Sequence, residues 1–333
     1  MKFGLRLIEY VGSPRQLVEL AVLAEKVGFD SVWFPHDPFM RHTWVMMAAV
    51  AEHTDRIQIG TVGTNPYTTD PSEIASFIAT LDDLSKGRSI LGLGLHTRDM
   101  VGWTGHDATE VIERTRQSVE MIRALFAGEV VARETSEFSW SDQCYLRFEP
   151  YRREIPIYVA GFGPEYMTLS GEIGNGSLPM ITPPESSAYM SAPILAGATA
   201  AGRKAEAVDI CGCAWLSLSA DGSGTQDLLR PMAAYFGPYL EDGAMATIGL
   251  SRADFSDIRG HIDNARYDAA QAAVGGNMFK LGLAGSPQDI IPRIEAAAEM
   301  GVTHINLGGP IGPDPAEAVR LMGERVIPQF KSH

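Results

Sequence analysis

The sequence contains little cysteine, no excess of positive charge and no long apolar run. Its three cysteines are odd in number and lack framework spacing, which argues against a disulfide-stapled secreted domain. Its formal net charge of −14 argues against binding nucleic acid or an anionic membrane through the general field of the protein. No stretch reaches the roughly 18 uninterrupted apolar residues of a membrane span, and no signal segment precedes Phe3. We therefore expect a cytoplasmic protein whose partner is a small molecule.

Short apolar runs alternate with longer amphipathic segments along the chain. The runs predict strands at Phe3–Ile8, Ser31–Phe34, Ile57–Val62, Ser89–Leu95, Ile157–Ala160, Ile210–Ser219, Phe279–Ala284 and His304–Leu307. The segments between them have helical spacing, as in Pro14–Val27. Eight strand-then-helix units in one run favour a single (β/α)8 barrel domain over residues 1–333, rather than an open doubly wound sheet. We expect two interruptions, an excursion near residues 129–150 and a helical insertion near residues 228–277.

In such a barrel the functional residues lie at the carboxyl ends of the strands. His36 and Asp37 follow the second predicted strand directly, and they join a group that titrates near neutral pH to a carboxylate. Their functional interpretation is proton transfer or hydrogen bonding to a cofactor. The alternative is a surface histidine beside a helix-capping aspartate, and position alone does not decide between the two.

The third and fourth predicted strands also end in candidate residues. Thr64-Asn65-Pro66-Tyr67 follows the third strand, where the alternative is an ordinary turn with Tyr67 as packing. Gly94 ends the fourth strand, where glycine marks close approach by a ligand or by another element. The polar residues His96, Thr97, Arg98 and Asp99 then suggest substrate contact, with a solvated loop as the alternative.

The turn from the fifth predicted strand into the next helix is a candidate phosphate site. It reads Ala160-Gly161-Phe162-Gly163-Pro164, and proline suits the first turn of a helix because its missing N–H costs nothing there. Unpaired backbone N–H groups and the helix dipole attract an anion at such a turn. Many turns of this kind bind nothing, so the pattern alone is a weak indication.

Several segments resemble those of methylenetetrahydromethanopterin reductase and its relatives. They are Gly60–Tyr67, Leu81–Arg88 with the following Leu-Gly-Leu-Gly, Ala284–Pro287 and Gly308–Asp314, so the resemblance spans essentially the whole chain. It implies a luciferase-like barrel of the branch that uses coenzyme F420, an 8-hydroxy-5-deazaflavin. The implied activity is direct hydride transfer between deazaflavin C5 and an organic substrate, by an enzyme that is often a homodimer.

The resemblance also implies roles for particular residues. A non-prolyl cis peptide is expected at Val62–Gly63, or one residue later, behind the cofactor ring. The cofactor would contact His36, Val62, Gly63, Thr64, Asn65 and Gly94, and its phosphate would lie near Ala160, Gly161, Phe162 and Gly163. His36, Asp37 and His96 are the expected catalytic group, with His36 or His96 delivering a proton, and no metal is expected.

Departures from the family pattern bear on the substrate. Relatives tend to have Asp before His after the second strand, whereas here His36 precedes Asp37. The methanopterin reductase has a glutamate where this chain has Arg6, and relatives often have an acidic residue near the position of Thr97. We therefore expect Arg6, Thr97 and Arg98 to contact an anionic or electron-poor substrate. The alternatives are an FMN-dependent monooxygenase of the same superfamily and a non-catalytic flavin-binding protein.

Overall fold

The computed structural model describes residues 1–95, 98–179 and 181–331, except for the side chains of residues 98–100. Segments that are distant in sequence form two compact units. Unit 1 comprises Met1–Asp30, Pro179–Ala192 and Ile210–His333, and unit 2 comprises Ser31–Leu178 and Pro193–Asp209. Within the described part of the chain, no helix is both long and apolar enough to cross a membrane.

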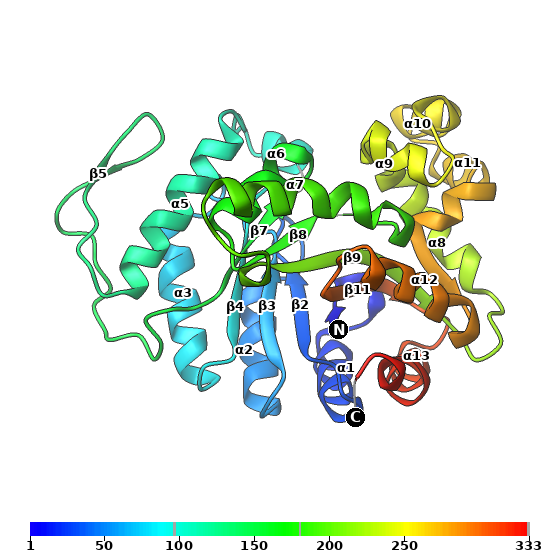
Figure 1. The fold of residues 1–333 in the computed structure, drawn as a ribbon, viewed down its shortest axis with the longest axis horizontal. Coiled ribbons are helices and arrows are strands. Elements are labelled where there is room, and N and C mark those ends of the chain that lie inside the picture. The colour runs from blue at the N-terminus through cyan, green and yellow to red at the C-terminus, as the bar shows by residue number, and fades with distance from the viewer. Residues whose placement is uncertain (96–97, 180, 332–333) are drawn as a thin grey trace. The chain divides into compact units, whose positions relative to one another are not determined.

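Unit 2 is built on the strand order β2-β3-β4-β7-β8, in which β2, β3, β4 and β7 pair in parallel. The strands are β2 (Ser31–Pro35), β3 (Gln58–Val62), β4 (Ser89–Leu93), β7 (Ile157–Gly161) and β8 (Gly176–Pro179). The helices are α2 (Thr43–His53), α3 (Pro71–Leu84), α4 (Arg98–Trp103), α5 (Val111–Phe126) and α6 (Pro164–Ile173). Figure 1 shows α2 and α3 beside β3 and β4. Every residue of β4 is buried, as expected of a strand that is covered on both faces.

Local sequence signals explain where these elements begin and how they pack. The Asp70 side chain caps α3 by accepting a hydrogen bond from the Ser72 amide at 2.8 Å, and Pro71 occupies the first helical turn. In the core, the Trp33 ring lies against Gly60, where a Cβ would come within 2.4 Å of it. The side chain missing from Gly60 therefore makes the space that the indole fills.

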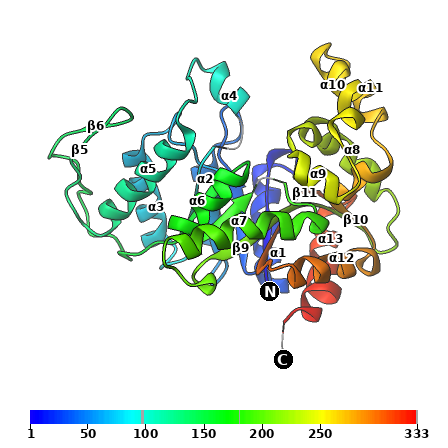
Figure 2. The same ribbon diagram turned by 45° about the horizontal axis from the view of Figure 1, so that its top comes forward.

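Unit 1 has the strand order β10-β9-β11-β1, and all three neighbouring pairs are parallel. The strands are β1 (Lys2–Arg6), β9 (Asp209–Leu218), β10 (Gly282–Gly285) and β11 (His304–Ile311). The helices are α1 (Pro14–Val27), α8 (Thr225–Phe236), α9 (Asp242–Thr247), α10 (Ser256–Asp263), α11 (Tyr267–Ala272), α12 (Pro287–Glu299) and α13 (Pro315–Leu321). α7 (Ser187–Ala200) has residues in both units. In Figure 2, α8, α10 and α11 gather together.

The two faces of the unit 1 strands differ in chemistry. Side chains alternate along a strand, so Phe3, Leu5 and Leu307 share one face, and all three are buried. Asn306 is in register with Cys213 and lies on the opposite face, as does Arg6 at the end of β1. One face of this sheet is therefore apolar, and the other carries buried polar side chains.

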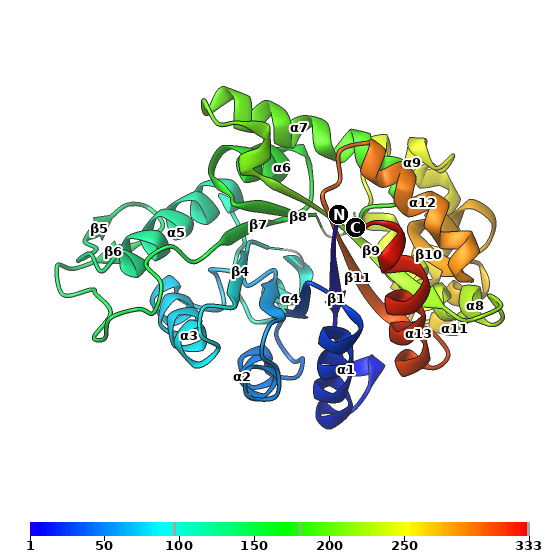
Figure 3. The same cartoon turned by 60° about the horizontal axis from the view of Figure 1, so that its bottom comes forward.

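The predicted order of strands and helices needs two corrections. β8, which lies beside β7 in Figure 3, was not predicted, because Gly176-Ser177-Leu178-Pro179 contains a single large apolar residue. The strand predicted at Phe279–Ala284 is a 3₁₀ segment, Gly276–Leu281, followed by β10. The segment 129–150 contains a small hairpin of β5 (Arg133–Glu134) and β6 (Ser139–Trp140), and the segment 228–277 is mostly helical.

Candidate active site at the carboxyl ends of the strands

His36 follows the end of β2 and is held in a stack of rings. Its imidazole lies 5.2 Å from the Trp44 ring at an interplanar angle of 11°, and Trp44 stacks on Phe77 at 4.4 Å. Burial, and secondarily the neighbouring His42, lowers the pKa of His36 to about 4. The ring is therefore neutral near pH 7, so it can form hydrogen bonds but is a weak reservoir of protons. Its Nδ1 atom is buried and has no partner in the described part of the chain.

A cavity of about 360 Å³ opens beside this ring. Residues 36–43 line it, together with Thr68, Thr69, Thr104 and His106. Its volume suits part of an organic ligand. Imidazole and hydroxyl groups line it, so it favours a ligand with hydrogen-bonding groups.

The turn after β3 holds two further polar groups. The Asn65 side-chain oxygen accepts hydrogen bonds from the backbone amides of Tyr67 at 3.1 Å and Thr68 at 2.9 Å. This arrangement is an Asx turn, and it holds the Asn65 amide in one orientation. The Asn65 Nδ2 and Thr64 Oγ1 atoms are both buried and have no partner among the described residues. The predicted turn is present, and it fixes two unsatisfied polar groups.

The expected non-prolyl cis peptide at Val62–Gly63, or one residue later, is wrong. Within the described residues the cis peptide is Gly309–Pro310. The chain bends after β3 through Gly63, whose φ of 81° lies in a region that glycine adopts readily. Thr64 then pairs with Leu93 as an isolated bridge. The bend is therefore made by trans bonds and a glycine.

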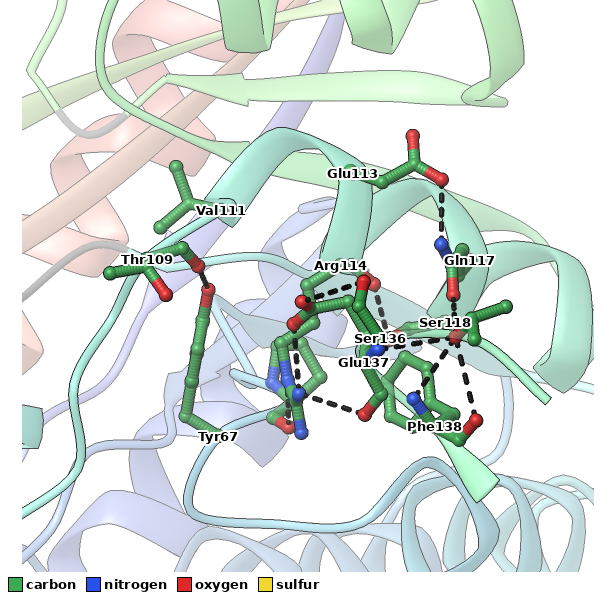
Figure 4. Close-up of polar contacts among 12 residues, drawn as sticks. Tyr67, Thr109, Val111, Glu113, Arg114, Gln117, Ser118, Ser136, Glu137 and Phe138 are labelled. Carbon is green, nitrogen blue, oxygen red and sulfur yellow. Dashed lines mark hydrogen bonds and ion pairs between the residues drawn. The ribbon is translucent and has the colours of Figure 1, made fainter. Parts of the chain in front are cut away.

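Arg114 of α5 connects this turn to the β5–β6 hairpin (Figure 4). Its Nε donates to the Pro66 carbonyl at 3.0 Å, and its Nη1 donates to the Glu137 carbonyl and carboxylate, each at 3.1 Å. The guanidinium carbon lies 4.8 Å from the centre of the Tyr67 ring and 4.5 Å from that of Phe138. These contacts hold the backbone beside Asn65 from the side of α5.

Glycines at the ends of β4 and β7 make room for neighbouring groups. A Cβ on Gly94 would lie 1.8 Å from the Ala160 carbonyl oxygen, and a Cβ on Gly161 would lie 2.4 Å from the Tyr166 ring. Gly163 caps α6 with a φ of 93° and no side-chain cap, so the first N–H groups of this helix are available to a ligand. Glu165 in the first turn opposes an anion there.

The other predicted site residues are placed as follows. Val62 is the last residue of β3 and is buried. Arg6 belongs to unit 1, and Arg98 is the first residue of α4. His96 and Thr97 lie outside the described residues.

Sequence reasoning missed three residues around the site, Trp44, Phe77 and Arg114. Trp44 and Phe77 lie inside apolar helices, where a large ring is indistinguishable from ordinary packing. Arg114 contacts Pro66 across 48 residues, and nothing in the sequence indicates that pairing.

Comparison with known proteins gives consistent matches, which cover from about half to nearly all of the chain. The family model described as luciferase-like monooxygenase matches residues 2–304. The 5,10-methylenetetrahydromethanopterin reductase of Archaeoglobus fulgidus is 30% identical over 338 residues, which cover 99% of this chain and 100% of the reductase. The F420-dependent glucose-6-phosphate dehydrogenase of Amycolatopsis mediterranei is 37% identical over 191 residues, or 53% of this chain and 56% of the dehydrogenase.

A solved structure gives the same result for the fold. The coenzyme F420-dependent tetrahydromethanopterin reductase of Methanopyrus kandleri superposes with a TM-score of 0.92 at 27% identity, covering 99% of each chain. The predicted (β/α)8 barrel of the luciferase-like type is therefore confirmed.

Proposed function

The chain belongs to the luciferase-like monooxygenase family, and from that premise we propose that it is an oxidoreductase that uses coenzyme F420. The reaction is hydride transfer between the cofactor and a small organic substrate. Relatives named for F420 or for methylenetetrahydromethanopterin reduction support this proposal. Reduction of an electron-poor acceptor is the direction that we infer.

The observation that carries the proposal is a set of buried polar atoms without partners. They are His36 Nδ1, Thr64 Oγ1 and Asn65 Nδ2, and all follow the carboxyl ends of β2 and β3. A buried polar atom without a partner costs roughly 1–3 kcal/mol, so three of them near one edge of a sheet call for a polar ligand. The carbonyl oxygens and ring nitrogens of a deazaflavin offer the complementary groups.

The residues of unit 2 have distinct roles in this proposal. When bound, the deazaflavin supplies a carbon that carries a hydride as a two-electron equivalent. Asn65 donates through an amide that its own turn holds in place, and His36 forms hydrogen bonds as a neutral imidazole. Gly94 makes room for the Ala160 carbonyl and Gly161 for the Tyr166 ring, which shapes the strand ends, and the first turn of α6 receives a phosphate group.

Proton delivery remains a prediction for His36, Asp37 and His96. His36 is a neutral imidazole near pH 7, because burial lowers its pKa to about 4. A proton that leaves His36 must therefore first be delivered to it. Asp37 lies in the same cavity lining and is the neighbouring group that we expect to exchange that proton.

The first experiment is a parallel titration of the purified protein with F420 and with FMN, followed by fluorescence quenching. We expect tight binding of F420 and weak binding of FMN. Preference for FMN would overturn the cofactor assignment in favour of the monooxygenase alternative. Binding of F420 without turnover of any acceptor in a broad screen would favour a non-catalytic binding protein.

A variant with the same shape tests the site itself. Asn65→Asp keeps the oxygen that accepts from the turn and removes the Nδ2 donor. We expect it to weaken F420 binding by about five- to tenfold, since one hydrogen bond to a buried partner contributes about 1–1.5 kcal/mol. Thr80→Ala on the exposed face of α3 is the control and should leave the dissociation constant unchanged. Equal binding by Asn65→Asp and the wild type would remove Asn65 from the site.

The proposal is accompanied by expectations about the oligomeric state and the location of the protein. We infer a homodimer, which light scattering on the purified protein would test by its mass. We also infer a cytoplasmic location, and the net charge of −14 makes nucleic acid an unfavourable partner.

A further inference from the structure

Arg6, the last residue of β1, is a buried cation without a counter-ion. The residue is 8% exposed, and no hydrogen bond or ion pair joins its side chain to another described residue. Among those residues it is also the one arginine or lysine in the buried set. A buried charge is stable only when it is paired and hydrogen-bonded. This guanidinium therefore calls for an anion.

The backbone beside Arg6 is shaped to admit the guanidinium. Gly308 is its register partner on β11, and a Cβ there would lie 2.2 Å from Arg6 Nη2 and 2.3 Å from Nε. The guanidinium thus lies flat against a position that only glycine leaves open. The side chain is held at a defined place, at the carboxyl end of its strand.

Two more polar side chains on the same sheet lack partners. Asn306 is 0% exposed, and neither its Oδ1 nor its Nδ2 has a partner in the described part of the chain. It lies two residues before Gly308 on β11, on the face that carries Arg6. Ser217 near the end of β9 is also 0% exposed with an unpartnered Oγ. Unit 1 thus presents a cation, a donor, an acceptor and a hydroxyl, none of them satisfied.

Arg88 of unit 2 shows how this fold treats a structural arginine. It makes five hydrogen bonds, to the carbonyl oxygens of Ala51, Thr54, Ile57 and Ser85 and to the Thr54 hydroxyl. Arg6 makes no comparable hydrogen bonds to the described residues. The contrast indicates that Arg6 binds a ligand, whereas Arg88 stabilises the fold.

We propose that Arg6 and Asn306 form an anion-binding subsite in unit 1, and that its ligand is an organic carboxylate with a hydroxyl group beside it. The planar guanidinium matches a carboxylate with two parallel hydrogen bonds. A single cation balances one negative charge, which favours a carboxylate over a phosphate dianion. The Asn306 amide donates to the carboxylate and accepts from the neighbouring hydroxyl. This binding of an anion does not depend on the proposed function, because the residues proposed to hold F420 belong to unit 2.

An internal counter-ion is the competing explanation. Cys213 is in register with Asn306. Its pKa is lowered, first by a hydrogen bond with Cys211 and, against the opposing effect of burial, also by Arg6. If a Cys213 thiolate paired with Arg6, the arginine would stabilise the protein, and its removal would destabilise it. The carboxylate subsite predicts the opposite, because removal of an unpaired buried cation relieves a cost.

The test is calorimetric binding of glycolate at constant ionic strength, with glycolamide and inorganic phosphate as comparison ligands, to protein with and without F420. The variants are Arg6→Met, Gly308→Ala, which keeps the charge but moves it, and Arg15→Met at an exposed position as the charge-matched control. We expect glycolate to bind the wild type and Arg15→Met at least about tenfold more tightly than glycolamide. Arg6→Met should lose this difference and Gly308→Ala should reduce it. Without ligand, Arg6→Met should unfold at the same or a higher temperature than Arg15→Met.

Three results would overturn the subsite. They are equal glycolate binding by Arg6→Met and the wild type, tighter binding of phosphate than of glycolate, or a lower unfolding temperature for Arg6→Met than for Arg15→Met. F420 affinity, measured on the same proteins, tests the proposed function separately. Loss of F420 binding by the wild type would refute the cofactor assignment whatever the result with glycolate.

Discussion

Thr61 and Thr64 lie three residues apart on the same stretch of chain, and both are buried. The Thr61 hydroxyl donates to the Gly92 carbonyl at 3.0 Å and accepts from the Gly92 amide at 2.9 Å. The Thr64 hydroxyl has no partner in the described part of the chain. The first threonine links β3 to β4, and the hydroxyl of the second is unsatisfied by the described residues.

The two ends of the strands in unit 2 differ in the same way, in whether their buried polar groups have hydrogen-bond partners. At the amino end of β4, Asp82 is 0% exposed, and its carboxylate accepts from the Ser89 hydroxyl at 2.7 Å and from Arg152 Nη2 at 2.6 Å. Arg88 lies in the same region and donates hydrogen bonds to four backbone carbonyls and the Thr54 hydroxyl. At the carboxyl ends, His36, Thr64 and Asn65 carry unpartnered atoms.

This contrast distinguishes stability from function within one fold. Barrels of this class place stabilising contacts at the amino ends of the strands and reactions at the carboxyl ends. In unit 2 the fully paired Asp82 and Arg88 therefore belong to the scaffold, and His36, Thr64 and Asn65 belong to the proposed site. Substitutions at the two ends should have opposite effects on stability and on cofactor binding.

The largest effect is expected at the amino end, from Arg152→Ala. It leaves the buried Asp82 carboxylate without its ion-pair partner, which should lower the free energy of unfolding by about 3–5 kcal/mol. Urea denaturation measures this loss. The neighbouring Arg153 is 67% exposed and pairs with an exposed glutamate, so Arg153→Ala is the control and should change stability by less than about 0.5 kcal/mol. Equal losses in the two variants would contradict the assignment of Asp82 to the scaffold.

The next effect is a pH dependence from His36. Its pKa is lowered from 6.5 to about 4, so between these values the unfolded chain binds a proton that the folded protein does not. The stability that neutral His36 permits is therefore present above pH 6.5 and is lost as the pH falls towards 4. Between pH 7 and pH 5 we expect a loss of up to about 2 kcal/mol from this residue.

The measurement compares wild type with His36→Asn in urea at both pH values. The variant should lose stability less steeply than the wild type as the pH falls. His53→Asn at an exposed position is the control and should retain the wild-type dependence. An unchanged slope in His36→Asn would show that other groups cause the acid sensitivity.

The sequence alone predicted the fold and the strand ends that carry polar residues. His36, Thr64 and Asn65 directly follow apolar runs, so the rule about carboxyl ends was sufficient to select them. It could not show which hydroxyl is satisfied, because Thr61 reaches Gly92 across 31 residues through a strand register that the sequence does not specify. For the same reason, Leu81–Arg88 was treated as a family signature, whereas Asp82 and Arg88 are contacts of the scaffold.

Other features could not be predicted for local reasons. β8 has one large apolar residue and resembles a loop. The bend at Gly63 was assigned a cis peptide by resemblance, although glycine reaches the observed φ of 81° without one. Arg6 was singled out by its unusual charge, and its role stays a prediction, but the unpartnered Asn306 on β11, the neighbour of β1, appears only when the strand order is known.

The two threonines provide the most sensitive test, because the same small change is made at both. Thr61→Val removes two hydrogen bonds and takes the hydroxyl partner from the buried Gly92 amide, whereas the Gly92 carbonyl still accepts from the Thr64 amide at 2.9 Å. It should cost about 1–3 kcal/mol of stability. Thr64→Val removes only an unsatisfied hydroxyl, so the free energy of unfolding should stay the same or rise by up to about 1 kcal/mol. Its F420 affinity should fall by about fivefold, corresponding to about 1 kcal/mol for one neutral hydrogen bond. Urea denaturation and fluorescence titration on both variants measure these effects. If Thr64→Val were destabilised as much as Thr61→Val, its hydroxyl would have a partner within the protein, and the distinction between scaffold and site would fail at this position.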